Sequence, residues 1–184
     1  MNTPEEARLH DAEADARRLL AALKDDCDSS SDDPQECECA VCKDGTEAVE
    51  KRQQEAMEKH GWYAHFIVGD DPASPTGFNY HTHGFTDTFH QPDLQAVLPL
   101  DPKVVHDIFA EIADRLREGT KFVVGKPIGD IVRGGYKIMF AIAHESDRVV
   151  WRLIIPDPHG NLLKETVEGL FAEQWEGCEA ANED

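Results

Sequence analysis

A nearly continuous apolar segment, residues 136–155, reads YKIMFAIAHESDRVVWRLII and is broken chiefly by the polar stretch HESDR. In the expected strand over 136–143, both alternating sets of side chains carry apolar residues. This pattern is typical of a central strand that is covered on both faces. HESDR is short enough for a hairpin, and residues 149–155 form the second expected strand. The segment therefore predicts a β-hairpin within a buried sheet.

Outward from this hairpin, the strongest helical signal covers residues 101–118. Asp101-Pro102 begins it, and Val105, Ile108, Phe109, Ile112 and Leu116 fall on one face at helical spacing. Further helices are expected over 46–60 and 162–175, and further strands over 62–68, 78–83, 94–100 and 121–124. The fold class predicted is α+β, with a largely antiparallel sheet of about six strands and the long helix packed on one face.

The N-terminal third of the chain has a different character. Thr3-Pro4-Glu5-Glu6 is typical of a helix start and predicts a helix over 4–24. Residues 25–50 hold ten acidic residues against one basic residue, Lys43, which favours a disordered linker. We expect a helical arm over 1–24, an acidic linker with a cysteine cluster over 25–45, one α+β domain over 46–176 and a flexible tail over 177–184.

Charge and hydropathy exclude several classes of protein. The 184 residues carry a formal net charge of −19, which disfavours binding to nucleic-acid phosphates and to anionic lipid. The sequence contains no run of eighteen consecutive apolar residues, so it predicts no membrane-spanning helix. The first eighteen residues are acidic and polar, unlike a secretory signal, so we expect a cytoplasmic protein. The expected partner is therefore an unknown protein, a small molecule or a metal ion.

Three of the five cysteines form a Cys-x-Cys-x-x-Cys cluster at Cys37, Cys39 and Cys42. Three thiolates on so short a segment can hold a structural zinc ion if the backbone turns tightly. Candidates for the fourth ligand are Cys27, Cys178 and His60. The alternative is a set of free or redox-sensitive cysteines. Catalysis by a thiolate is disfavoured, because the neighbouring Glu36 and Glu38 would raise the thiol pKa.

Histidines gather in the expected strand over 78–83 and in the loop after it. Asn79, His81 and His83 share one face of that strand, and Phe78 and Tyr80 share the other. Asp87 and His90 follow and are expected to fold back over the first face. Asn79, His81, His83 and His90 would then line one cleft. The cleft could hold a metal ion, bind a polar ligand without metal, or be structural.

Arg152 lies inside the apolar run over 149–155. A charge in a buried strand needs a partner or a route to solvent. It either pairs with a carboxylate of the sheet or binds an anion together with Arg148 or Arg133.

Several segments of the chain resemble a known family. They are His60-Gly61-Trp62, Phe78-Asn79-Tyr80, Gly84–Phe89, Pro92-Asp93-Leu94 and the strand with its Pro-Asp-x-x-Gly turn over 149–160. Together they resemble the bacterial and phage domain-of-unknown-function family 4262, over roughly residues 58–175. Some members also look as if they begin with a Cys-x-Cys-x-x-Cys stretch. The chain departs from the family pattern at Gln91, where the family usually has His, and in the extra histidines of 81–83. The family implies no agreed activity.

Three hypotheses for function follow. The first is a binding or interaction module with a structural zinc at the cysteine cluster. The second is a metal-dependent enzyme, hydrolase-like, with its site at His81, His83 and His90. The third is an acidic inhibitor, or a mimic of nucleic acid toward a nucleic-acid-binding partner. The sequence leaves open whether the protein is an enzyme.

Overall fold

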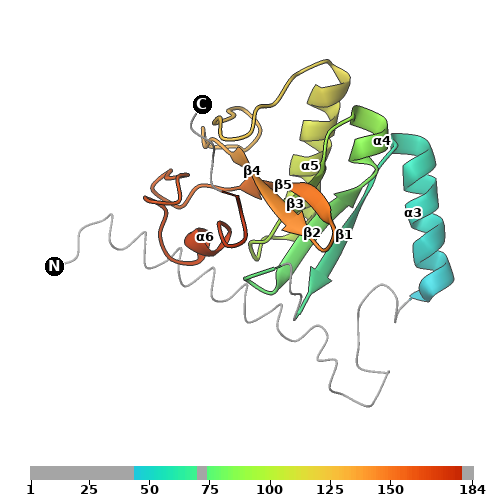
Figure 1. Cartoon of the computed structure of the whole chain (residues 1–184). Coiled ribbons are helices and arrows are strands. Elements are labelled where there is room, and N and C mark those ends of the chain that lie inside the picture. Colours follow the sequence, from blue (N-terminus) through green and yellow to red (C-terminus); the bar gives the residue numbers. More distant parts are fainter. Residues whose placement is uncertain (1–43, 70–73, 180–184) are drawn as a thin grey trace, which may run out of the picture. The chain divides into compact units, whose positions relative to one another are not determined.

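The structure is a computed structural model that describes residues 44–69 and 74–179 (Figure 1). The chain divides into two units, residues 1–55 and 56–184, and the whole sheet belongs to the second. The predicted helix over 4–24 and the cysteines Cys37, Cys39 and Cys42 lie outside the described residues, as does nearly all of the linker.

The described residues form five strands in one sheet. They are β1 (Tyr63–Val68), β2 (Phe78–His83), β3 (Asp93–Ala96), β4 (Met139–Glu145) and β5 (Arg148–Ile154). Their order across the sheet is β1-β2-β3-β5-β4. Only β3 and β5 pair in parallel; the other neighbours are antiparallel. The helices in the described part of the chain are α3 (Thr46–His60), α4 (Phe85–Phe89), α5 (Pro102–Arg117) and α6 (Leu170–Glu173).

The mixed α+β class and the β4–β5 hairpin are confirmed. The central position expected for the first strand of that hairpin is wrong, because β4 lies at an edge of the described sheet. Two further predicted elements are also wrong. Residues 121–124 are not a strand, because Gly125 and Pro127 follow at once and Val123 is 56 % exposed. The sheet therefore has five strands where about six were expected. The helix expected over 162–175 shrinks to α6, because Gly169, at φ 60°, interrupts the helical backbone directly before it.

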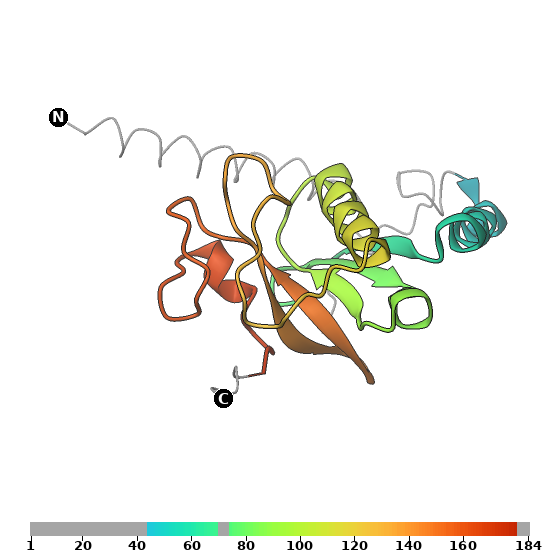
Figure 2. The same ribbon diagram turned by 90° about the horizontal axis from the view of Figure 1, so that it is seen from above.

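The long helix α5 lies on one side of the sheet (Figure 2). Asp101 caps its first turn by accepting a hydrogen bond from the backbone N–H of Lys103, and Pro102 occupies the first helical position. Its buried face carries Val105, Ile108, Phe109, Ile112 and Ala113. The predicted burial of Ile108 and Ile112 is therefore confirmed.

Replacing Ile108 or Ile112 with alanine should lower the free energy of unfolding by about 2–5 kcal/mol, because each change removes buried methyl groups and leaves a cavity. Urea denaturation measures the loss. Val104 of the same helix is 48 % exposed, so Val104→Ala serves as the control and should cost less than about 1 kcal/mol. Equal effects at all three positions would contradict this packing of α5.

The C-terminal segment covers part of the sheet. Leu162, Val167 and Trp175 form one apolar cluster with Met139, Ala141 and Ile154 of the β4–β5 hairpin. Ala141 pairs with Arg152 in the sheet register, so this cluster lies on the face that also carries Arg152. Toward β2 and β1 the same face carries Gln95, Asn79, His81, His83 and His65, with Ile67 beside Asn79.

Candidate metal centre

One row of side chains crosses the polar part of the sheet. Strand pairing places His65 of β1 opposite His81 of β2, His81 opposite Gln95 of β3, and Gln95 opposite Arg152 of β5. His81, Gln95 and Arg152 are all buried. Buried polar groups are retained where they are hydrogen-bonded or functional. This row is therefore the first place to look for a site.

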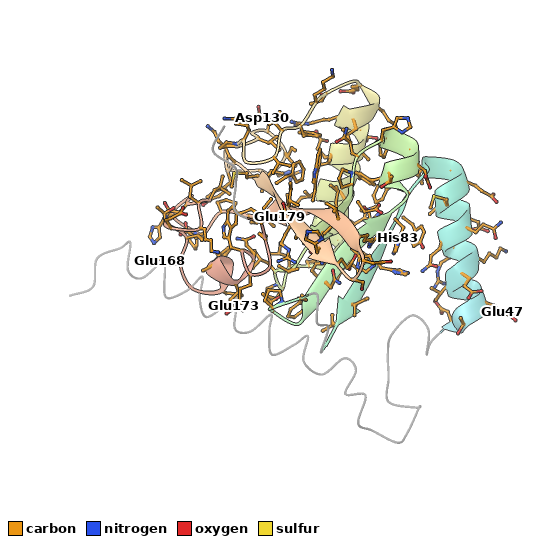
Figure 3. All side chains as sticks on the ribbon, in the orientation of Figure 1. Glu47, His83, Asp130, Glu168, Glu173 and Glu179 are labelled. Atoms are coloured by element: carbon orange, nitrogen blue, oxygen red, sulfur yellow. The ribbon has the colours of Figure 1, made fainter. Side chains whose placement is uncertain are left out.

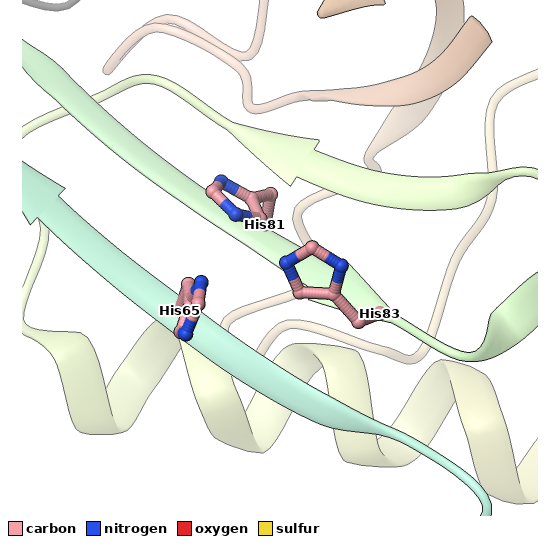
Figure 4. A group of neighbouring side chains, drawn as sticks. All are labelled: His65, His81 and His83. Carbon is pink, nitrogen blue, oxygen red and sulfur yellow. The ribbon is translucent and has the colours of Figure 1, made fainter. Parts of the chain in front are cut away.

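Three histidines meet in this region. His65, His81 and His83 each offer one ring nitrogen, and these three nitrogens lie within 4.8 Å of one another. The ring centroids are 4.9–5.4 Å apart and the rings are nearly perpendicular. Figure 4 shows the rings standing on the same side of β1 and β2. Because β1 and β2 are paired strands, the backbone itself holds the rings together.

A carboxylate on the β4–β5 hairpin orients one of these rings. Glu145 Oε1 lies 2.9 Å from Nδ1 of His81 and accepts a 2.7 Å hydrogen bond from Nδ2 of Asn79. Asn79 Oδ1 in turn accepts a hydrogen bond from Nε2 of Gln95. Nδ1 of His81 faces this carboxylate, and in the neutral ring a hydrogen on Nδ1 leaves Nε2 as the nitrogen with a lone pair.

Glu145 is charged in this setting. Burial by itself would raise its pKa, but hydrogen bonds from His81, Asn79 and Arg148 lower the pKa of Glu145 to about 2. The site therefore holds a buried negative charge near the histidines at neutral pH.

Arg148 supplies the opposite charge. Its Nε donates to Glu145 Oε2 at 2.8 Å, and its Nη1 donates to Asp93 Oδ2 at 2.9 Å. The same Nη1 lies 3.3 Å from the carbonyl oxygen of Thr82 and 3.4 Å from Nδ1 of His83. One guanidinium thus joins the hairpin turn to β2 and β3.

His83 lies at the end of β2 (Figure 3) and carries a free polar atom. Its Nε2 is buried and has no hydrogen-bond partner. Every other buried side-chain nitrogen or oxygen in the described residues has one. Burial, with Arg148 as the next cause, lowers the pKa of His83 to about 4. Burial also lowers the pKa of His65. Both rings are therefore neutral at pH 7, as a metal ligand must be.

The residues predicted for the histidine cleft do not all come together. Asn79, His81 and His83 share one network, as their spacing indicated. Asp87 and His90 are exposed: the expected loop is the helix α4, and His90 forms its C-cap at φ 55°. His90 is not a member of the three-histidine group.

Arg152 lies deeper and has structural contacts. Its Nε donates to Gln95 Oε1 at 2.9 Å, and its Nη1 donates to the backbone carbonyls of Gln174 and Glu176. Both carbonyls belong to the C-terminal segment. The partners of Arg152 thus include an amide and backbone carbonyls, and the negative charge of Glu145 on the sheet also acts on it.

The residues considered as a fourth ligand of the cysteine cluster lie as follows. His60 is exposed at the end of α3. Cys178 is a half-buried free cysteine beside Arg152, and burial raises the pKa of its thiol. Cys27 lies outside the described residues.

The sequence analysis missed His65 and Glu145, and it did not connect Arg148 with the histidines. One signal for His65 was present: it lies in the expected strand over 62–68, and a neighbouring antiparallel strand carries His81 and His83. Nothing in the sequence placed Glu145 against His81, because the two are far apart in the chain. The hydrogen bond from the neighbouring Asn79 to Glu145 spans 66 positions.

Comparison with known proteins adds the following. Residues 56–154 match the family model described as Domain of unknown function (DUF4262), and this range contains the three histidines, Glu145, Arg148 and Asp93. Neither the curated proteins nor the solved structures yield a match. No described helix is long and apolar enough to cross a membrane. Because the family model covers more than half of the 184 residues, the chain belongs to the DUF4262 family.

Proposed function

We propose that this protein binds one divalent transition-metal ion, of the zinc class, through His65, His81 and His83. The observation that carries the proposal is the approach of their three ring nitrogens within 4.8 Å of one another. Nitrogens around a tetrahedral zinc ion lie about 3.3 Å apart, given Zn–N bonds of about 2.0–2.1 Å. Binding of an ion would therefore require the three rings to rotate toward one another.

The chemistry of the surroundings supports a metal ligand set. Imidazole nitrogens suit zinc, copper, iron and nickel. Metal-bound histidines commonly donate their second ring N–H to a carboxylate, which fixes the tautomer. The contact between His81 Nδ1 and Glu145 has this arrangement. The unpartnered Nε2 of His83 supplies a buried atom that an ion would satisfy.

A metal titration of the full chain tests the proposal. Because Cys37, Cys39 and Cys42 are a second predicted zinc site, the titration uses a background in which all three are serine. After treatment with a chelator, this protein should bind one Zn²⁺ per chain by calorimetry. The parent chain, which keeps the three cysteines, should bind a second Zn²⁺ ion if the cysteine site exists.

The ligand histidines and their controls give opposite expectations. His65→Ala or His81→Ala should weaken Zn²⁺ binding by more than about 100-fold, since the loss of an outer carboxylate alone weakens metal sites about 10–100-fold. His90→Asn removes the third histidine of the sequence-based hypothesis and suits the left-handed backbone there. It should bind Zn²⁺ as tightly as the parent, and so should His144→Ala, which changes an exposed histidine. Unchanged affinity in His65→Ala would overturn the proposal.

A hydrolytic use of the ion is a second candidate. It is favoured by the number of ligands, because three protein ligands leave one coordination position for water, as in catalytic zinc sites. Zinc-dependent cleavage of an activated ester, lost in His65→Ala and kept in His90→Asn, would support it. The inhibitor or mimic hypothesis rests on the acidic stretch over 25–45, nearly all of it outside the described residues, and stays a prediction.

A further inference from the structure

The turn of the β4–β5 hairpin reaches the histidines from another part of the sheet. Glu145 ends β4, Arg148 begins β5, and the two face each other in register. Although β3 separates β5 from β2 in the sheet order, both side chains contact residues of β2. The charged groups beside the three histidines thus include two from one short turn.

We infer that Glu145 and Arg148 are positioning residues that set the metal affinity of His65, His81 and His83 in opposite directions. The inference rests on the proposed function and deepens it. Glu145 raises the affinity and Arg148 lowers it, so the β4–β5 turn is the element that tunes the site.

Glu145 acts through His81. By accepting the hydrogen on Nδ1 of His81, it keeps the lone pair of Nε2 available for an ion. Its negative charge is buried, with a side chain 9 % exposed, and attracts a cation more strongly there than it would in water. Asn79 holds the same oxygen in place.

Arg148 acts through His83. A guanidinium can only donate hydrogen bonds. When Nη1 donates to Nδ1 of His83, the hydrogen of the neutral ring is on Nε2, and that nitrogen cannot bind a metal. An ion therefore selects the other tautomer, in which Nη1 keeps its bonds to Asp93 and Thr82. The positive charge of Arg148 also repels the ion directly.

Asp93 fixes Arg148 in this position. Its Oδ1 accepts hydrogen bonds from the hydroxyl of Thr82 and from the backbone N–H of Phe85, both at 3.1 Å. Its Oδ2 is left for Arg148. Because the carboxylate is held by two other donors, Arg148 cannot move away from His83 without losing a bond to a buried partner.

Two variants test the inference in the full chain with Cys37, Cys39 and Cys42 replaced by serine. Glu145→Gln should weaken Zn²⁺ binding by about 10–100-fold. Arg148→Met should strengthen it by about tenfold, because it removes both the competing donor and the positive charge. Asp147→Asn is the control, since it changes the charge of an exposed residue in the same turn and should leave the affinity unchanged. Circular dichroism confirms that each variant is folded.

The direction of the change in Zn²⁺ affinity distinguishes opposite effects of Glu145 and Arg148 from a general loss of structural support. If both variants weaken binding, the turn is only a support and the inference is wrong. If the parent and the control bind no Zn²⁺, the proposed function fails and the inference fails with it. Nitrogen NMR of the metal-free protein adds an independent readout: in Arg148→Met the population of His83 with hydrogen on Nδ1 should rise, and an unchanged tautomer would also overturn the inference.

Discussion

Replacing Arg152 with methionine should lower the free energy of unfolding by about 3–5 kcal/mol. Arg152 is 2 % exposed, and its guanidinium binds the side-chain oxygen of Gln95 and the carbonyls of Gln174 and Glu176. Methionine fills a similar volume but removes the guanidinium donor of Gln95 Oε1 and of the Glu176 carbonyl, whereas the Gln174 carbonyl keeps the thiol of Cys178 as a donor. A buried acceptor that loses its partner costs about 1–3 kcal/mol. Urea denaturation of the full chain measures the loss.

Arg115 offers a matched control. It too bonds one side chain, Glu111, and two backbone carbonyls, those of Gly129 and Asp130. Its side chain is 23 % exposed, so water can replace the lost bonds. Arg115→Met should therefore cost about 1 kcal/mol or less. Equal losses in the two variants would show that burial of Arg152 does not decide its contribution.

The Arg152→Met variant also distinguishes a structural role of Arg152 from a role in anion binding. If Arg152 were an anion-binding residue, as one sequence interpretation had it, methionine would abolish ligand binding and change stability little. The contacts instead join β5 to the C-terminal segment, whose Trp175 belongs to the same apolar cluster as Ile154 of β5. A large loss of stability is therefore the outcome that the structure leads us to expect.

The sequence predicted the elements whose signals are local. The helix α5 has a cap, a proline and an apolar face within its own residues, and the hairpin of β4 and β5 follows from apolar alternation and a short turn. Residues 162–175 also carry apolar spacing, but Gly169 breaks the helix. The parallel pairing of β3 with β5 joins residues far apart in the chain, and no local pattern specifies such a register.

The candidate site was predicted only in part for the same reason. Asn79, His81 and His83 lie on one strand, where alternation alone gives their common face. His65 joins them through the pairing of β1 with β2, and Glu145 joins them through the β4–β5 hairpin. His90 was expected to join because residues 84–91 were interpreted as a loop. The helix α4 forms there, and His90 is exposed at its C-terminal end.

Gly84 links that helix to the histidine strand, and its replacement by alanine should lower the free energy of unfolding by about 2–5 kcal/mol. Gly84 has a φ of 100° and separates His83 from Phe85. A left-handed backbone costs a residue with a Cβ about 1–2 kcal/mol. An added Cβ would also lie 2.4 Å from the carbonyl oxygen of Gly61, and overpacking of this kind costs about 1–3 kcal/mol.

Gly119 separates strain from crowding in this prediction. It also has a positive φ, 87°, but a Cβ there would meet no atom within 4 Å. Gly119→Ala should therefore lose only the backbone contribution of about 1–2 kcal/mol. The Gly61 carbonyl cannot simply retreat, because it accepts a 2.6 Å hydrogen bond from the hydroxyl of Thr88 in α4. If denaturation gives the same loss for both variants, the close approach of Gly84 to Gly61 is wrong. A larger loss of unfolding free energy in Gly84→Ala than in Gly119→Ala would support this close approach. Because Gly84 directly follows His83, Zn²⁺ affinity should then fall in Gly84→Ala and stay unchanged in Gly119→Ala.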